Sequence, residues 1–173
     1  MGLQLIFVVE TKKSCKSDWI YIKETIDRFY EYENTKVKFT PVYMDGKGKY
    51  KNKEREIKSY ISQYSSTSKD NESKVIYCFD CDDYDSKPED LVFLNNAHQY
   101  CNEKGYDFVW FCKDIEQVYI GKRIADKQKK AESAKFKMKK GIDKVEKIRL
   151  SAENYQLKTS NILKVFDQYL SQK

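Results

Sequence analysis

Short apolar runs separated by helix-like segments dominate the first two thirds of the chain. Residues 5–9 and 75–79 are continuously apolar, and residues 106–112 are mostly so. Runs of this length are typical of strands that are buried on both faces of a parallel sheet. A further strand is expected at about residues 36–44, and Pro41 within it indicates an edge position or a bulge.

Apolar residues between these strands recur at helical spacing. The first helix should follow an N-cap at Ser17 or Asp18, the second should begin near Lys53, and the third should run from about Pro88 to a C-cap at Gly105. One helix in each connection favours right-handed crossovers. The chain is therefore predicted to be an α/β protein, with a parallel sheet of about four strands and helices on both faces.

The pattern changes near residue 122, so we expect an α/β domain over residues 1–121 and a basic helical extension over residues 122–173. Residues 121–173 carry fifteen Lys or Arg and six Asp or Glu, a balance of +9, whereas the whole chain has a net charge of +6. A polyanion-binding surface has this asymmetry, and so does a solvated Lys-rich helix. Apolar residues in the extension predict one or two amphipathic helices, which could dock a partner or a second copy; they include Ile148, Tyr155, Ile162 and Phe166.

The five cysteines are an odd number, and Cys78 and Cys112 lie in apolar runs, which favours reduced and mostly buried thiols. The sequence shows no stretch long enough to span a membrane and no signal-type N-terminus. The expected location is the cytoplasm, with no membrane partner.

Acidic residues end two of the apolar runs. Glu10 follows the first strand, and Asp80 and Asp82 follow the third. Parallel strands bring their carboxyl ends to one edge of a sheet, where α/β proteins place their chemistry. Crowded carboxylates repel one another unless a hard cation such as Mg²⁺ lies among them. Asp clusters after strands also serve as loop residues and helix N-caps, which is the structural alternative.

Other charged residues are expected around this edge. Asp80 and Asp82 are two positions apart, so they leave the same face if the extended chain continues that far. Glu116 is a weaker candidate for a further metal ligand, or it lies in the first turn of the next helix. Lysines in the surrounding loops could neutralise phosphates, or they are merely solvated: Lys12, Lys13, Lys47, Lys49, Lys113 and Lys122.

These motifs resemble the TOPRIM domain, the fold that serves topoisomerases, bacterial primases and several nucleases. The resemblance covers about residues 3–121 and rests on Val8-Val9-Glu10, a Gly-containing loop after the second strand, and Phe79-Asp80-Cys81-Asp82. The compact chain is most similar to the RloB-type and OLD-type proteins of bacterial defence and mobile elements. It departs from many TOPRIM domains in having Thr11-Lys12 after the first Glu, where a Gly is common.

The resemblance implies a metal-dependent nuclease that hydrolyses phosphodiesters of DNA or RNA, in phage defence or in a mobile element. It implies Mg²⁺ or Mn²⁺ at Glu10, Asp80, Asp82 and Glu116, with the first three catalytic. Asp80 would be the principal ligand, and Glu10 would bind a second ion or act as a general acid or base. The resemblance to OLD-type proteins also implies a partner ATPase.

Two alternatives come from another class. In a receiver-like regulator, the acid after the first strand and Asp80 would form an acidic pocket with Lys113. In a degenerate TOPRIM scaffold, the basic extension would bind a partner without catalysis. Metal binding with nucleic-acid turnover would separate the nuclease from both, and acetyl-phosphate labelling of Asp80 would favour the receiver.

Overall fold

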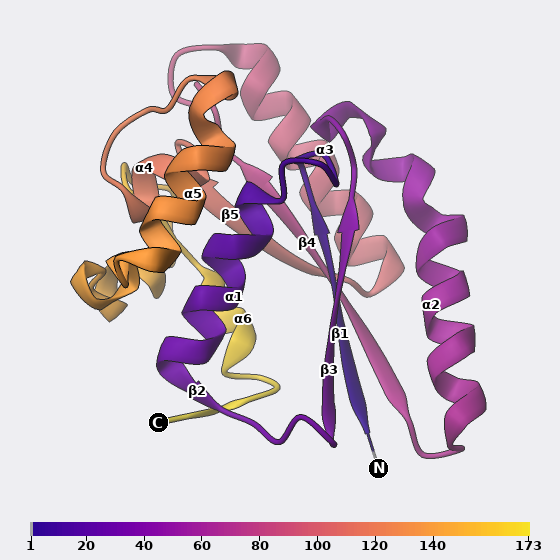
Figure 1. The fold of residues 1–173 in the computed structure, drawn as a ribbon. Coiled ribbons are helices and arrows are strands. Elements are labelled where there is room, and N and C mark those ends of the chain that lie inside the picture. The colour runs from indigo at the N-terminus through magenta and orange to yellow at the C-terminus, as the bar shows by residue number, and fades with distance from the viewer. Residues whose placement is uncertain (1) are drawn as a thin grey trace.

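A computed structural model describes residues 2–173 of the chain. Its centre is a five-stranded sheet with the order β3-β1-β4-β5-β6, in which the first four strands are parallel and β6 runs antiparallel to β5 (Figure 1). The predicted parallel α/β fold is confirmed at this level. The strands are β1 (Leu3–Val9), β3 (Val37–Tyr43), β4 (Glu72–Asp80), β5 (Asp107–Cys112) and β6 (Thr159–Ser160).

Helices cover both faces of the sheet. The helices α1 (Ser17–Phe29), α4 (Ile115–Tyr119), α5 (Lys129–Met138) and α6 (Ile162–Phe166) lie on one face. The opposite face is covered by α2 (Glu54–Thr67), by α3 (Pro88–Lys104) and by the 3₁₀ helix Lys47–Lys53 that precedes α2. Further 3₁₀ turns occupy Asp126–Gln128, Gly141–Lys144 and Lys147–Leu150.

Strand β1 shows why its sequence is continuously apolar. Leu5, Phe7 and Val9 pack under α1, whereas Ile6 and Val8 pack under α2 and α3, and all five are fully buried. A strand with helices on both faces has no water-facing side, so the alternation of polar and apolar residues disappears.

Several local expectations are confirmed. Pro41 lies in the edge strand β3, where its missing N–H leaves no gap inside the sheet. Gly105 ends α3 in the left-handed conformation, with φ of 72°. The expected cap of α1 is wrong, because the helix already includes Ser17 and follows Lys16 without a side-chain cap.

The segment 122–173 differs most from expectation. Instead of one or two amphipathic helices it contains α5, 3₁₀ turns, the strand β6, the short helix α6 and β7 (Ser171–Gln172), which pairs with β2 (Tyr30–Glu31). Ile162 and Phe166, two of the residues that one alternative assigned to docking a partner, are fully buried and share one core with β1 and α1. These two side chains pack against the core of their own chain and are not free for a partner, whereas Ile148 is 77% exposed.

No helix within residues 2–173 combines the length and apolar character needed to cross a membrane. The five cysteines are all free, and four of them are buried, as predicted.

Candidate functional site

The strand order reverses between β1 and β4. The chain passes from β1 to β3 on one side and then to β4 on the other, so that the two connections cover opposite faces of the sheet. In open α/β sheets, ligands bind at the carboxyl ends of the strands beside such a switch point. Glu10 directly follows β1, and Asp80 is the last residue of β4.

Backbone groups hold the Glu10 and Asp80 carboxylates at this edge. Glu10 Oε2 accepts a hydrogen bond from the Asp80 N–H, and Asp80 Oδ1 accepts one of 2.9 Å from the Ile115 N–H at the start of α4. The two side chains are thereby brought together, as the sequence predicts. The hydrogen bonds compensate part of the cost of burying a carboxylate.

Two more carboxylates, both of them buried, lie next to this pair. Asp18, in the first turn of α1, is 7% exposed, and its Oδ2 accepts a hydrogen bond of 3.3 Å from the Thr11 N–H. Glu116, in α4, is 1% exposed. Its Oε1 has no hydrogen-bond partner within residues 2–173, and Lys129 Nζ is 3.9 Å from it. Glu116 does lie in the first turn of a helix, the structural alternative noted from the sequence.

Burial raises the pKa of each of these four carboxyl groups. It raises the pKa of Glu10 to about 8, that of Asp18 to about 6 and that of Glu116 to about 7. Burial, and then the charges of Glu10 and Asp18, raise the pKa of Asp80 well above its usual range. Burial alone would lower the pKa of Lys129, but the Glu116 and Asp80 carboxylates outweigh it and the pKa is raised. The edge is therefore a cluster of acids with raised pKa values beside the Lys129 ammonium group.

A cleft with a volume of about 570 Å³ opens over the cluster. Lys129, the first residue of α5, and Asp126 and Lys127 before it form part of its wall. Its lining combines acids and lysines, with Glu10, Asp18, Asp45, Asp80 and Asp126 among the first and Lys12, Lys127 and Lys129 among the second.

Asp82 does not follow the expected path. β4 ends at Asp80, and Asp82 has a positive φ of 50°, so the alternation that would align it with Asp80 is broken. Its carboxylate instead pairs with Lys47 Nζ. Both remain close enough to affect Glu10, because the Asp82 charge raises the Glu10 pKa and the Lys47 charge lowers it.

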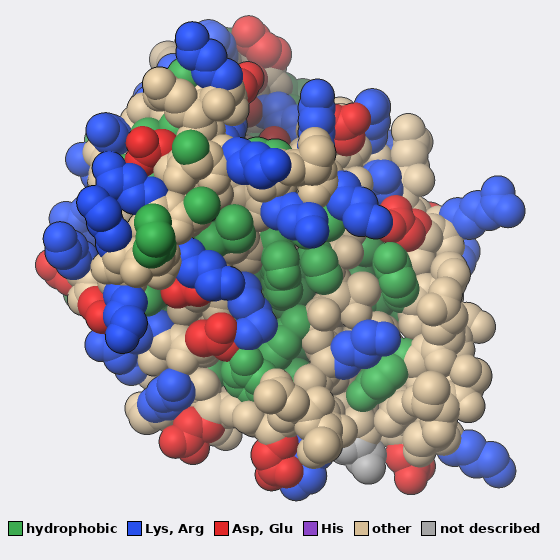
Figure 2. Space-filling view, viewed as in Figure 1, with side chains coloured by type: hydrophobic (Ala, Val, Ile, Leu, Met, Phe, Trp, Pro, Cys, Tyr) green, Lys and Arg blue, Asp and Glu red, His purple; other side chains and the backbone are tan. Residues whose placement is uncertain are grey.

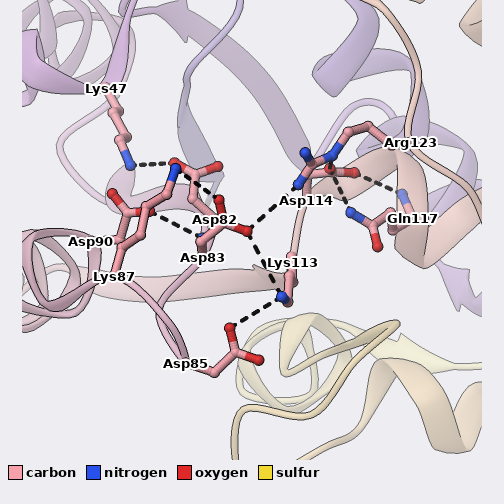
Figure 3. Close-up of polar contacts among 10 residues, drawn as sticks. All are labelled: Lys47, Asp82, Asp83, Asp85, Lys87, Asp90, Lys113, Asp114, Gln117 and Arg123. Carbon is pink, nitrogen blue, oxygen red and sulfur yellow. Dashed lines mark hydrogen bonds and ion pairs between the residues drawn. The ribbon is translucent and has the colours of Figure 1, made fainter.

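The other acids of the β4–α3 loop, Asp83 and Asp85, form ion pairs (Figure 3). Lys113 Nζ lies 3.1 Å from Asp85 Oδ1 and 3.8 Å from Asp83 Oδ1, and Arg123 also contacts Asp83. These pairs hold the loop against the segment after β5. Lys113, predicted to bind phosphate, therefore has acidic partners in this structure.

The other predicted phosphate-binding lysines are spread out. Lys12 lines the cleft over Glu10 and is exposed. Lys49 is exposed, with Nζ 3.9 Å from Asp45 Oδ2. Lys122 lines a different cleft, beyond α4.

The sequence does not identify Asp18 and Lys129 as residues of the site. The sequence pattern predicts a helix cap at Ser17 or Asp18, and Lys129 is one of many lysines in its segment. The sequence contains one signal for Asp18. It lies in the first turn of the helix that follows Glu10, and the start of that helix is expected at the same edge of the sheet as Glu10.

The donor set suits a hard cation, and the unpartnered Glu116 oxygen is a buried acceptor in the same cluster. No three His, Cys, Asp or Glu side chains of residues 2–173 are grouped as they would be around an ion. Glu10 and Asp80 turn oxygens toward backbone N–H groups instead. Taken together, fold and site define a helix-covered α/β protein with an acidic cleft at its switch point. Comparisons with protein-family models, curated proteins and solved structures gave no match.

Proposed function

We propose that the chain is a metal-dependent nuclease whose active site is the acidic cleft at the ends of β1 and β4. The observation that carries the proposal is the gathering of the half-buried Glu10 and Asp80 with the buried Asp18 and Glu116 in one cluster beside the cleft. Such a cluster is costly without a bound cation. The TOPRIM-like order of Glu10 and Asp80 along the chain supports the same assignment.

Asp80 and Glu10 would hold Mg²⁺ or Mn²⁺, with Asp18 or Glu116 as further donors. Such an ion supplies polarisation of a phosphoryl oxygen and a lowered pKa for a bound water. If Glu10 does not bind the ion, its pKa of about 8 lets it take up and release a proton near neutral pH, as a general acid or base does. Lys12 and Lys129 line the cleft and can neutralise a phosphate there.

The test is cleavage of single-stranded and duplex DNA and of RNA with Mg²⁺ or Mn²⁺. Asp80→Asn should lower the rate by at least 10²-fold, because it removes a charged ligand and keeps the shape of the side chain. Asp70→Asn is the matched control, since Asp70 is exposed in the loop before β4 and should leave the rate unchanged. Equal rates for wild type and Asp80→Asn would refute the assignment.

A receiver-like regulator is less well supported. That function needs Lys113 beside Asp80, whereas Lys113 pairs with Asp83 and Asp85. Labelling of Asp80 by acetyl phosphate, without nucleic-acid cleavage, would favour it nonetheless. Phage defence and a partner ATPase remain proposals drawn from the RloB-type and OLD-type resemblance.

A further inference from the structure

A second cleft, of about 490 Å³, lies between the end of α4, one face of α5 and the 3₁₀ turns at residues 141–150. Five cations line it, namely Lys122, Lys135, Lys139, Lys144 and Arg149. Figure 2 shows Lys and Arg side chains gathered over α5 and the segment after it, at the left of the view. We call this region the basic cleft.

The cations of the basic cleft lack acidic partners. Within residues 2–173, none of the five forms an ion pair, and all five are exposed. Glu132 and Glu146 also line the cleft, which leaves an excess of three positive charges. Near the acidic cleft, Lys47, Lys113 and Lys129 are paired with carboxylates, whereas Lys12 and Lys127 are not paired within the described part of the chain. The basic cleft therefore gathers five cations without ion-pair partners among these residues around one hollow.

The floor of the basic cleft is closely packed. Tyr119 and Phe136 are 5% and 7% exposed, and their rings meet edge to face at 5.9 Å. Gly141 lies against Phe136 so closely that a Cβ would come within 2.4 Å of the ring. The floor thus belongs to the core, and the aromatic faces are not available for stacking against a base.

Helix α5 connects the two clefts. Its first residue, Lys129, lines the acidic cleft, whereas Lys135 and Lys139 line the basic cleft. A rise of 1.5 Å per residue places Lys135 about 9 Å along the helix from Lys129, and Lys139 directly follows the last helical residue. A nucleic-acid strand that reaches the acidic cleft can therefore continue over α5.

We propose that the basic cleft binds the sugar-phosphate backbone of the same nucleic-acid strand that is cleaved in the acidic cleft. This inference rests on the proposed function. Cations spread along a helix match a repeating phosphodiester, and the buried rings offer nothing to recognise a base. Binding should therefore depend on phosphates and be independent of sequence.

The test is anisotropy of a labelled single-stranded DNA oligonucleotide with the full chain in EDTA, over a series of salt concentrations. Lys135→Glu combined with Lys139→Glu should weaken binding at least tenfold and reduce the slope of log K against log [salt] by about 1.4, the value for two lost phosphate contacts on a single strand. Arg55→Glu combined with Lys58→Glu, exposed on α2 across the sheet, is the control with the same net charge.

Each outcome decides the inference. Equal losses in the two double variants would reduce the effect to net charge and overturn it, as would binding of ATP or tripolyphosphate at this cleft without binding of the strand. Cleavage by the Lys135→Glu/Lys139→Glu variant with unchanged KM would refute the basic cleft and leave the nuclease intact. Loss of strand binding in that variant, when wild type binds but does not cleave, would support the cleft and refute the nuclease.

Discussion

Single carboxyl groups decide the electrostatics of the acidic cleft. Glu10, Asp18, Asp80 and Glu116 are each shifted first by burial and then by the charges of their neighbours. Each therefore keeps its proton to a higher pH in the folded chain than in the unfolded one. Proton binding stabilises the folded chain, and a cation that replaced the protons would do the same.

A pH dependence of stability follows from these shifts. Between about pH 5 and about pH 8, the folded chain holds more protons than the unfolded chain, so the free energy of unfolding should fall as the pH rises. The part of the loss that belongs to Glu10 should be complete above its raised pKa, near 8. Urea unfolding midpoints across this range, without divalent cations, measure it.

Glu10→Gln provides the check on that slope. It removes one titrating group and keeps an oxygen that can accept the hydrogen bond from the Asp80 N–H. The decline with pH should become shallower. A decline as steep as that of wild type would mean that Glu10 is not one of the responsible groups.

Asp80 has two roles that different substitutions separate. Asp80→Ala loses the hydrogen bond from the Ile115 N–H, at a cost of about 1 kcal/mol, which partly offsets the relief of repulsion. Asp80→Asn keeps an acceptor and removes the charge, so the metal-free variant should be as stable as wild type or more stable. Thermal melts should show stabilisation by Mg²⁺ in wild type and not in Asp80→Asn. Equal stabilisation of both would exclude Asp80 as a ligand.

Among the elements, the parallel strands could be predicted because burial on both faces leaves a purely local mark. Residues 5–9 and 75–79 are apolar at every position, and the ends of β1 and β4 follow directly. From these ends, the neighbouring positions of Glu10 and Asp80 could be predicted as well. The ends of α3 could be predicted from single residues too, because proline has a φ that suits the first turn of a helix and glycine readily adopts the positive φ at its end.

Other elements depend on contacts that sequence patterns do not contain. β6 has two residues and exists because it pairs with the end of β5, and α6 is a single short helix over the core. The direction of Asp82 depends on a positive φ, and the place of Lys129 depends on how α5 packs against α1. Neither leaves a periodic signal.

The C-cap of α3 provides a prediction at the scale of elements. Gly105 has φ of 72°, and a Cβ there meets no atom within 4 Å, so only backbone strain opposes a side chain. Gly105→Ala should lower the free energy of unfolding by about 1 kcal/mol. Denaturant unfolding measures it, and no change would mean that the helix end adapts freely.

For the molecule as a whole, the segment 122–173 is structural. Phe166 is fully buried and packs edge to face on Phe7 and Tyr30, at 5.7 Å from each ring centre. The Tyr30 hydroxyl donates a hydrogen bond to Asp167. β7 then pairs with β2 beyond α1. The helical layer over β1 and β5 is therefore completed by residues far along the chain.

Phe166→Ala should accordingly lower the free energy of unfolding by about 3–5 kcal/mol, through lost burial and a residual cavity. Lys164→Ala, on the exposed side of the same helix, should change it by no more than about 0.5 kcal/mol. Chemical unfolding of both variants tests this. A small effect at Phe166 would mean that α6 is detached in solution.

Completion of the core by α6 also has a consequence during translation. Glu10 and Asp80 are synthesised early, but the segment 122–173 takes roughly 3–10 s more at 5–20 residues per second. During that interval the nascent chain exposes the apolar faces of β1, α1 and β5, and Lys129 has not yet reached the acidic edge. The growing polypeptide then exposes apolar surface of the kind that chaperones bind, and its acidic cleft is complete only once α5 has been made and has docked.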